Sequence, residues 1–248
     1  MAEQNLVYGL HAVEALLKNN PDSVLSLWVM DGRRDERLNA VLALAKKAGI
    51  EPASLPKKDL DTRAQSSKHQ GVLAQVRGEA PRLSENELVD YLNDLGVPPF
   101  VLVLDGVTDP HNLGACLRSA DAAGVHVVIA PKDRSAGLTP VARKVACGAA
   151  EAVPFVTVTN LARALRELKD AGIWIVGTAG EATDTVHQAD LRGPLALVMG
   201  AEGSGMRRLT KEHCDALVKI PMAGTVESLN VSVATGVCLF EALRQRQA

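Results

Sequence analysis

The chain has 248 residues, of which 47% are hydrophobic, so it is long enough for one large domain or two ordinary ones. Its formal net charge of −2 argues against a protein that coats nucleic acid non-specifically, although local basic clusters can still form a shaped RNA site. No apolar run approaches the roughly 20 residues of a membrane span, and the N-terminus lacks the pattern of a secretory signal. We therefore expect a cytoplasmic protein without a membrane partner.

The four cysteines are scattered along the chain and form no CxxC pair. Because no His/Cys cluster has metal-ligand spacing, we expect no metal site and predict buried free thiols.

Residues 1–80 alternate between helix and strand patterns. Apolar residues recur at helical spacing over residues 12–17 and again over residues 38–45, where Gly49 is placed to end the helix. Ser23–Met30 and Gln70–Val76 are typical of strands. The alternation predicts a small α/β sandwich as the first domain. Residues 81–98 are polar and acidic, are bounded by prolines and contain one weak helical pattern, so we interpret them as a linker.

Residues 99–248 repeat the alternation more strongly, as expected for a second domain built on a parallel sheet. The helix between the third and fourth strands has Asn160 as its expected N-cap and Gly172 beyond its end. The last helix is expected to begin near Ser228 and to run toward Arg246. Five short runs rich in Val, Ile and Leu are the strand candidates: Val101–Asp105, His126–Ala130, Phe155–Val158, Ile173–Thr178 and Leu195–Met199.

The loops that follow these strands are the first places to look for a site, because a parallel sheet binds ligands at the carboxyl ends of its strands. In the first loop, Asn112 stands where a helix N-cap is expected, and Gly114 and Arg118 share a helix face at i, i+4 spacing. Alone, this pattern fits a functional site, but it fits at least as well a structural role in which Asn112 only caps the helix and Arg118 only forms a surface ion pair.

Three further loops have the same ambiguity. Leu197–Met206 carries three glycines around Glu202 with GxxGxG spacing, which fits neither a dinucleotide fingerprint nor a P-loop. Ile220–Gly236 combines an apolar segment with Ser228 and Asn230, whose side chains are suited to capping. Gly177–Glu181 is a weak signal, since it can be a simple strand-ending turn.

Taken together, these segments resemble the SPOUT class of RNA methyltransferases, and within it the SpoU or TrmH-like family of ribose 2′-O-methyltransferases. The resemblance rests on NLGACLR, LVMGAEGSGM and IPMAGTVESLNVSVA, which occur in order over Phe100–Arg246. The N-terminal YGLHAVEALL and KHQGVLAQV resemble the substrate-binding domain of the branch that methylates a guanosine in the peptidyl-transferase region of bacterial 23S rRNA.

This resemblance implies a fold and an assembly that the residues alone do not. The implied fold is α/β, with a small L30e-like domain (residues 1–80), a linker (81–98) and a SPOUT parallel-sheet domain with a C-terminal trefoil knot (99–248). Members of the family dimerise through the knotted domain. The implied methyl donor is S-adenosylmethionine, and the implied partners are 23S rRNA, or its assembly precursor, and a second copy of the chain.

The resemblance also implies residue roles. Arg118 is the expected catalytic residue, but arginine is a poor base in proteins, so we expect it to hold a phosphate and stabilise a developing alkoxide. Asn112, Glu202, Ser228 and Asn230 are expected to orient Arg118 and the nucleotide. The residues implied to hold the adenosyl group, largely through backbone groups, are Thr178, Gly200, Ile220, Met222 and Leu229.

Contacts to RNA are expected from basic side chains of both domains, although solvated surface charge explains each of them equally well. Aromatic residues make up only 3% of the chain, which does not support a base-stacking platform. Three histidines, His11, His69 and His111, are further candidates. The basic candidates are Arg33, Arg34, Lys57, Lys58, Arg63, Lys68, Arg134, Arg143 and Lys144.

Three alternative functions compete with RNA methylation. A ribosome-assembly factor that kept the fold and lost catalysis is disfavoured by Arg118 and by the complete third motif. A nicotinamide-dependent oxidoreductase would need GxGxxG after its first strand, which is absent. A small-molecule methyltransferase would not need the N-terminal domain.

Overall fold

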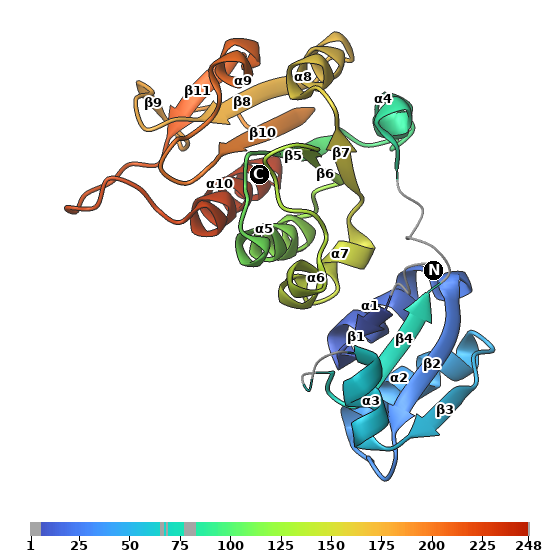
Figure 1. Ribbon diagram of the computed structural model, residues 1–248. Coiled ribbons are helices and arrows are strands. Elements are labelled where there is room, and N and C mark those ends of the chain that lie inside the picture. The colour runs from blue at the N-terminus through green and yellow to red at the C-terminus, as the bar shows by residue number, and fades with distance from the viewer. Residues whose placement is uncertain (1–5, 65–66, 68, 77–82, 248) are drawn as a thin grey trace. The chain divides into compact units, whose positions relative to one another are not determined.

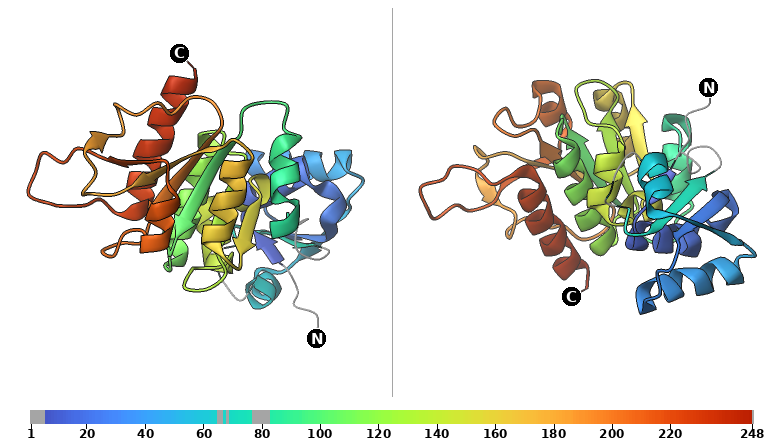
Figure 2. Two further views of the ribbon diagram at one scale, coloured as in Figure 1. Left: turned by 90° about the horizontal axis from the view of Figure 1, so that it is seen from above. Right: turned by 60° about the horizontal axis from the view of Figure 1, so that its bottom comes forward.

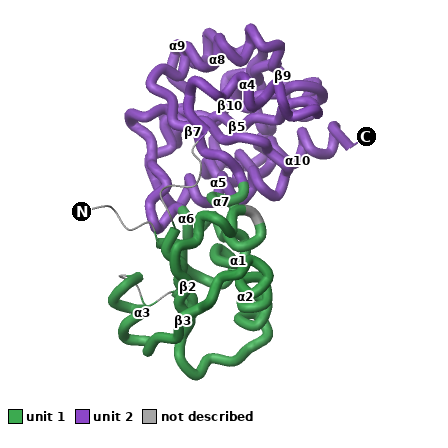
Figure 3. Tube along the Cα trace, turned by 90° about the vertical axis from the view of Figure 1, so that its right-hand side faces the viewer, with its two compact units in different colours: residues 1–82, 143–152 green, residues 83–142, 153–248 purple. Residues whose placement is uncertain are grey.

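The structure is a computed structural model that describes residues 6–64, 67, 69–76 and 83–247. It contains two compact units, one of residues 1–82 with 143–152 and the other of residues 83–142 with 153–248 (Figure 3). Each unit is described by itself below. The division into residues 1–80, 81–98 and 99–248 stays a prediction.

The first unit is built on a four-stranded sheet in the order β1-β4-β2-β3, in which β2 pairs antiparallel with β4 and parallel with β3 (Figure 1). Buried apolar residues of α1, α2, β2 and β4 form its core. As predicted, Gly49 follows α2 with a positive φ of 71°. The strands are β1 (Leu6–Tyr8), β2 (Val24–Met30), β3 (Pro52–Leu55) and β4 (Val72–Val76), and the helices are α1 (Leu10–Asn19), a 3-10 turn at Pro21–Ser23, α2 (Glu36–Lys47) and α3 (Lys57–Ala64).

The second unit is built on a seven-stranded sheet in the order β7-β6-β5-β10-β8-β11-β9, and its strand pairs are parallel. All five predicted strands are present, and the α/β class with a parallel sheet is confirmed. The knot stays a prediction. The strands are β5 (Phe100–Asp105), β6 (Val127–Pro131), β7 (Phe155–Val158), β8 (Trp174–Thr178), β9 (Asp184–Thr185), β10 (Leu195–Gly200) and β11 (Ala216–Lys219).

Helices cover both faces of this sheet (Figures 1 and 2). α5 and α10 pack against each other on one face. On the other face, α4 and α8 bury Leu88, Leu92 and Leu168 against β5 and its neighbours, and α9 packs on α8. The helices are a 3-10 turn at Glu85–Glu87, α4 (Leu88–Asn93), α5 (Pro110–Ala122), the start of α6 (Pro140–Ala146), α8 (Leu161–Asp170), α9 (Arg208–His213) and α10 (Val231–Arg246). The end of α6 and all of α7 (Ala149–Ala152) belong to the first unit.

The starts of α5 and α10 differ from the sequence prediction. The N-cap of α5 is Asp109, whose side chain accepts a hydrogen bond from the His111 N–H, so Asn112 lies inside the first turn. Pro110 explains this start, because proline at the first helical position loses no hydrogen bond. α10 begins at Val231 with Asn230 as its N-cap, so Ser228 lies in the preceding loop. The predicted N-cap of α8, Asn160, is confirmed.

Of the four cysteines, only Cys116 and Cys238 are buried. Cys214 is half-buried, and Cys147 is exposed, which corrects the prediction of four buried thiols. Burial raises the pKa of Cys116 to about 11 and the pKa values of Cys214 and Cys238 to about 12. In the described part of the chain, no helix is both long and apolar enough to cross a membrane.

Candidate functional site

The carboxyl ends of four adjacent strands meet at one edge of the second unit's sheet. Gly200 at the end of β10 lies opposite Asp105 at the end of β5. On the other side of β10, β8 ends at Thr178, which lies opposite Val218 of β11. Ile220 follows β11 directly. The loops singled out in the sequence therefore leave the same edge of the sheet, where parallel sheets bind their ligands.

A polar cluster at this edge joins the three motifs. Asn112 Nδ2 donates to Glu202 Oε1 at 3.2 Å, and Asn230 Nδ2 donates to the same oxygen at 2.6 Å. Asn230 Nδ2 also lies 3.0 Å from Asn112 Oδ1, and the Val231 N–H donates to Glu202 Oε1 at 3.2 Å. These residues come from the first turn of α5, the loop after β10 and the start of α10. We call Asn112, Glu202 and Asn230 the Glu202 cluster.

The Glu202 cluster holds a carboxylate by neutral donors at the start of a helix. The helix dipole favours a negative charge at the N-terminus of α10, so the position stabilises the carboxylate of Glu202. Asn230 is itself fixed, because its Oδ1 accepts hydrogen bonds from the Ser232 N–H and the Ser232 hydroxyl, at 2.9 and 2.6 Å. The arrangement fixes the orientation of the Glu202 carboxylate at the carboxyl edge of the sheet.

Arg118 and Ser228 are the two other predicted catalytic residues. Arg118 is exposed on α5, six residues after Asn112, and this spacing turns it onto a different side of the helix. Ser228 is exposed in the loop between β11 and α10. The structure thus brings together Asn112, Glu202 and Asn230, whereas the roles predicted for Arg118 and Ser228 stay predictions.

The residues predicted to hold S-adenosylmethionine fit an adenosyl group. The loop of residues 221–228 is exposed, and within the described residues no backbone–backbone hydrogen bond engages it, which leaves amides and carbonyls for a ligand. Half-buried Ile220 and Leu229 provide apolar surface at its two ends. The Thr178 hydroxyl donates to the Val198 carbonyl at 3.1 Å, so its contribution to a ligand would come from its backbone.

Gly200 is required by the loop that follows it. A Cβ placed on Gly200 would lie 2.3 Å from the Gly205 carbonyl carbon and from the Met206 nitrogen. The loop closes there through two backbone hydrogen bonds between Ala201 and Gly205, which hold Glu202 at its turn. A side chain at Gly200 would therefore displace the Glu202 loop itself.

Sequence reasoning missed an ion pair beneath this loop. Asp105 is 1% exposed, and its carboxylate accepts from the Arg207 N–H at 2.8 Å and from Arg207 Nε at 2.6 Å, with Nη2 2.5 Å away. Asp105 shares its strand face with Val101 and Val103, which pack under α4 and α8. The Glu202 loop is thus anchored to α5 and α10 through Glu202 and to β5 through Arg207. An acidic residue at the end of an apolar strand was the available sequence signal.

Several basic residues predicted to contact RNA are engaged within the protein. Arg33 pairs with Asp35 at 2.5 Å, and the Arg63 guanidinium lies 4.7 Å from the centre of the Trp28 ring. Arg143 pairs with buried Glu151 at 2.9 Å. The predicted contact Lys68 lies outside the described residues.

The three histidine candidates are placed differently. His69 is buried and lies 3.0 Å from both Asp61 Oδ1 and the Gly71 nitrogen, which corrects its prediction as an RNA contact. His11 and His111 are exposed. Arg34, Lys57, Lys58, Arg134 and Lys144 are exposed as well.

Family models match most of the chain. Residues 99–240 match the SpoU rRNA Methylase family, and residues 6–81 match the family described as RNA 2'-O ribose methyltransferase substrate binding. The chain is similar to the 23S rRNA (guanosine-2'-O-)-methyltransferases RlmB of Shewanella oneidensis, with 58% identity over 100% of both chains, and of Pseudomonas putida, with 57% identity over 100% of this chain and 99% of that one.

Solved structures agree. The structure of the SpoU methyltransferase AviRb from Streptomyces viridochromogenes in complex with AdoMet matches with a TM-score of 0.79 and 25% identity, over 98% of this chain and 91% of that one. The AdoMet-bound rRNA methyltransferase from Sinorhizobium meliloti matches with a TM-score of 0.77 and 26% identity, over 96% of this chain and 86% of that one. From these matches and the motifs at the carboxyl edge of the sheet, the chain belongs to the SpoU rRNA methylase family.

Proposed function

We propose that this protein transfers a methyl group from S-adenosylmethionine to the ribose 2′-hydroxyl of a guanosine in the peptidyl-transferase region of 23S rRNA, as free RNA or within an assembling ribosomal particle. The observation that carries the proposal is the Glu202 cluster, which joins all three family motifs at the carboxyl edge of the sheet. Full-length identity of 58% to a 23S rRNA (guanosine-2'-O-)-methyltransferase supports the choice of substrate. A ribosomal substrate also supports a cytoplasmic location.

The chain's own residues have to align the hydroxyl and help its proton leave. When bound, S-adenosylmethionine supplies a methyl group that is already activated for in-line displacement. Ile220 and Leu229 would cover the adenine faces, and backbone groups at Thr178, Gly200 and Met222 would bind its polar edge. Gly200 would also keep the Glu202 loop closed against this pocket, because no side chain fits there.

Arg118 is the proposed catalytic residue. Because arginine is a poor base in proteins, the role of Arg118 would be to hold a phosphate next to the reacting ribose and to stabilise the oxyanion that develops. Asn112, Asn230 and Ser228 would position the nucleotide, and the fixed carboxylate of Glu202 would orient the guanidinium or the ribose.

A homodimer is the proposed assembly. Val233 and Phe240 are 53% and 49% exposed on α10, and their seven-residue spacing puts them on one helix face. A second copy of the chain would cover this apolar face. Light scattering should give the dimer mass at micromolar concentration, and Phe240→Glu should shift it toward the monomer. A monomeric wild-type protein would contradict the proposal.

The test of the proposed function separates catalysis from cofactor binding. Transfer of a labelled methyl group into 23S rRNA, with mapping of 2′-O-methylation, distinguishes an enzyme from an inactive assembly factor. Arg118→Ala should lose on the order of 10² in rate and still bind S-adenosylmethionine in calorimetric titration. Gly200→Val should lose the binding itself, because its side chain displaces the Glu202 loop. If Arg118→Ala loses cofactor affinity as severely as Gly200→Val, the catalytic role of Arg118 is wrong.

A further inference from the structure

The loop between β6 and α6 is fixed against the loop that follows β5. The Ala136 N–H donates to the Val107 carbonyl at 2.7 Å, and the Ser135 hydroxyl lies 3.4 Å from the same oxygen. A Cβ placed on Gly106 would lie 3.8 Å from the Arg134 carbonyl oxygen and 3.5 Å from the Ala201 Cβ. The backbone of Arg134 therefore stands beside the end of β5 and the start of the Glu202 loop.

Arg134 has a left-handed backbone, with a φ of 57°. This conformation is uncommon for any residue with a Cβ, whereas glycine adopts it without strain. A turn that needed only this geometry would be more stable with glycine or asparagine at this position. An arginine held in such a backbone suggests that its side chain serves a purpose that compensates for the strain.

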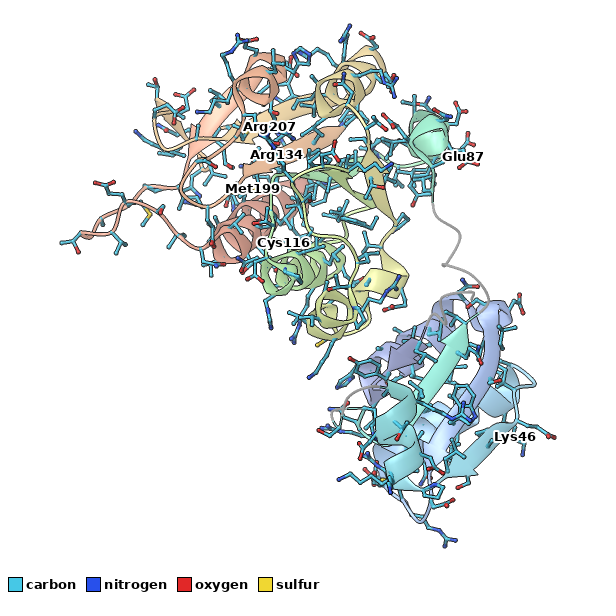
Figure 4. The ribbon with its side chains drawn as sticks, viewed as in Figure 1. Lys46, Glu87, Cys116, Arg134, Met199 and Arg207 are labelled. Atoms are coloured by element: carbon cyan, nitrogen blue, oxygen red, sulfur yellow. The ribbon has the colours of Figure 1, made fainter. Side chains whose placement is uncertain are left out.

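The side chain of Arg134 is exposed, and within the described residues it has no hydrogen bond or ion pair. Arg207, by contrast, is paired with Asp105, and Arg143 is paired with Glu151. Figure 4 labels Arg134 and Arg207 at the loop end of the second unit's sheet. At this edge Arg134 thus offers a full set of guanidinium donors to a ligand.

We infer that Arg134 binds a phosphodiester group of the substrate RNA next to the target nucleotide. The inference rests on the proposed function and adds to it a specific anchor for the RNA backbone. A planar guanidinium matches two phosphate oxygens. The backbone of Arg134 lies beside Gly106, and Ala201 also lies beside Gly106, so the Arg134 side chain starts close to the loops that carry Asn112 and Glu202. The fixed loop backbone would limit where the phosphate can lie, and so which ribose reaches Glu202.

Arg134→Gly tests the inference without straining the turn. We expect the melting temperature to equal or exceed the wild-type value, because glycine relieves the left-handed backbone. RNA affinity at about 0.1 M salt should fall about tenfold, and the slope of log affinity against log salt should decrease in magnitude by about 1, as expected for one lost phosphate contact. Affinity for S-adenosylmethionine, measured by calorimetry, should not change.

Three further variants separate charge from backbone. Arg134→Lys should keep the salt slope and part of the affinity, because the charge remains but the planar fork is lost. Arg134→Ala should lose affinity like Arg134→Gly but melt at a lower temperature than Arg134→Gly, because alanine keeps the Cβ that strains the left-handed backbone. Arg166 is exposed on α8 and has no partner within the described residues, so Arg166→Ala is the matched control and should leave the salt slope unchanged.

The outcomes distinguish this inference from the proposed function. If the wild-type protein transfers no methyl group to 23S rRNA, the proposed function fails. If the wild-type protein methylates 23S rRNA and Arg134→Gly binds it with wild-type affinity and salt slope, Arg134 is only a turn residue. A loss of activity in Arg134→Gly with an unchanged salt slope, or a loss of cofactor affinity, would also overturn the phosphate contact.

Discussion

The two edges of the seven-stranded sheet are built from opposite kinds of loop. At the carboxyl edge, side-chain amides and a carboxylate converge on an exposed place at the ends of β5 and β10. At the amino edge, Pro98, Pro99 and Pro194 precede β5 and β10, and they line a hollow together with Leu92 and Ile173. Proline has no N–H to offer a ligand. The comparison shows that the carboxyl edge presents hydrogen-bonding side chains to a ligand, whereas the prolines of the amino edge contribute only to the packing of the fold.

The same helix, α10, is held at both edges. Its start is bound by the Glu202 cluster. Its end is bound by Arg246, whose Nη2 donates to the Pro98 carbonyl at 2.7 Å, whose Nη1 donates to the Gly193 carbonyl, and whose guanidinium lies 4.8 Å from the centre of the Phe100 ring. Gln245 adds hydrogen bonds to the backbone of Ala189 and Leu191. These contacts satisfy backbone groups, so we expect them to affect stability more than catalysis.

Glu202→Gln should give the largest effect on catalysis at the carboxyl edge, with little effect on the stability of the fold. Glutamine can still accept hydrogen bonds from Asn230 and Val231, so the loop should remain closed while the negative charge is lost. We expect the methylation rate to fall on the order of 10²-fold with a melting temperature close to the wild-type value. Single-turnover methylation of 23S rRNA and thermal unfolding measure the two effects. A wild-type rate would remove Glu202 from the catalytic site.

Removing either partner of the Asp105–Arg207 pair should lower the free energy of unfolding, and the two losses should differ in size. Asp105→Asn keeps an acceptor for the Arg207 N–H and leaves a guanidinium that is already 47% exposed, so we expect a loss of about 1–2 kcal/mol in the free energy of unfolding. Arg207→Gln leaves a buried carboxylate without its counter-charge and should cost more. Urea unfolding of both variants checks the order, and equal losses would contradict it.

Five strands of the second sheet, and β2 and β4 of the first, are predictable because each is a short run of apolar or β-branched residues. β1 and β3 are not predicted, since β1 has only three residues and β3 is a short, mostly exposed segment. β11 was missed, since Ala216–Lys219 is only four residues long and half-buried, and β9 has only two residues. The start of α5 was misplaced because Asn112 was favoured over the Asp109-Pro110 pair, although proline at the first position is the stronger signal.

Only the residues of the candidate site that lie within the motifs could be predicted from the sequence. Asn112, Glu202 and Asn230 were singled out by their motifs, and the structure brings them into one cluster. The Asp105–Arg207 pair joins residues 102 positions apart, and no local pattern in a single sequence indicates which charge a buried carboxylate will meet. The left-handed backbone of Arg134 is likewise set by tertiary contacts rather than by its neighbours in sequence.

Arg246→Ala tests the amino edge. We expect a loss of about 1 kcal/mol in the free energy of unfolding, because two hydrogen bonds to carbonyls and one cation–π contact disappear from a partly exposed side chain. The methylation rate and the affinity for S-adenosylmethionine should stay within about twofold, since α10 is still held at its start. A rate loss as large as that of Glu202→Gln would show that the two edges are coupled through α10.

The smallest effect is expected from the buried thiols between the two edges, which should change the pH dependence of stability only above neutral pH. Burial raises the pKa of Cys116 to about 11 and the pKa of Cys238 to about 12, and the Cys116 thiol lies 3.5 Å from the Thr235 hydroxyl where α5 meets α10. In an unfolded chain these thiols ionise near pH 8.5. Between that pH and about 11 the unfolded state therefore loses protons that the folded state keeps, and stability falls as the pH rises. Below about pH 8 both states are protonated, and the thiols should contribute no pH dependence.

Urea unfolding of wild-type protein and of Cys238→Ala from pH 7 to 10 measures this pH dependence, with Cys147→Ala, at an exposed position, as the control. A stability of Cys238→Ala that falls above pH 8.5 as steeply as that of the wild-type protein would mean that the Cys238 thiol is not the group responsible.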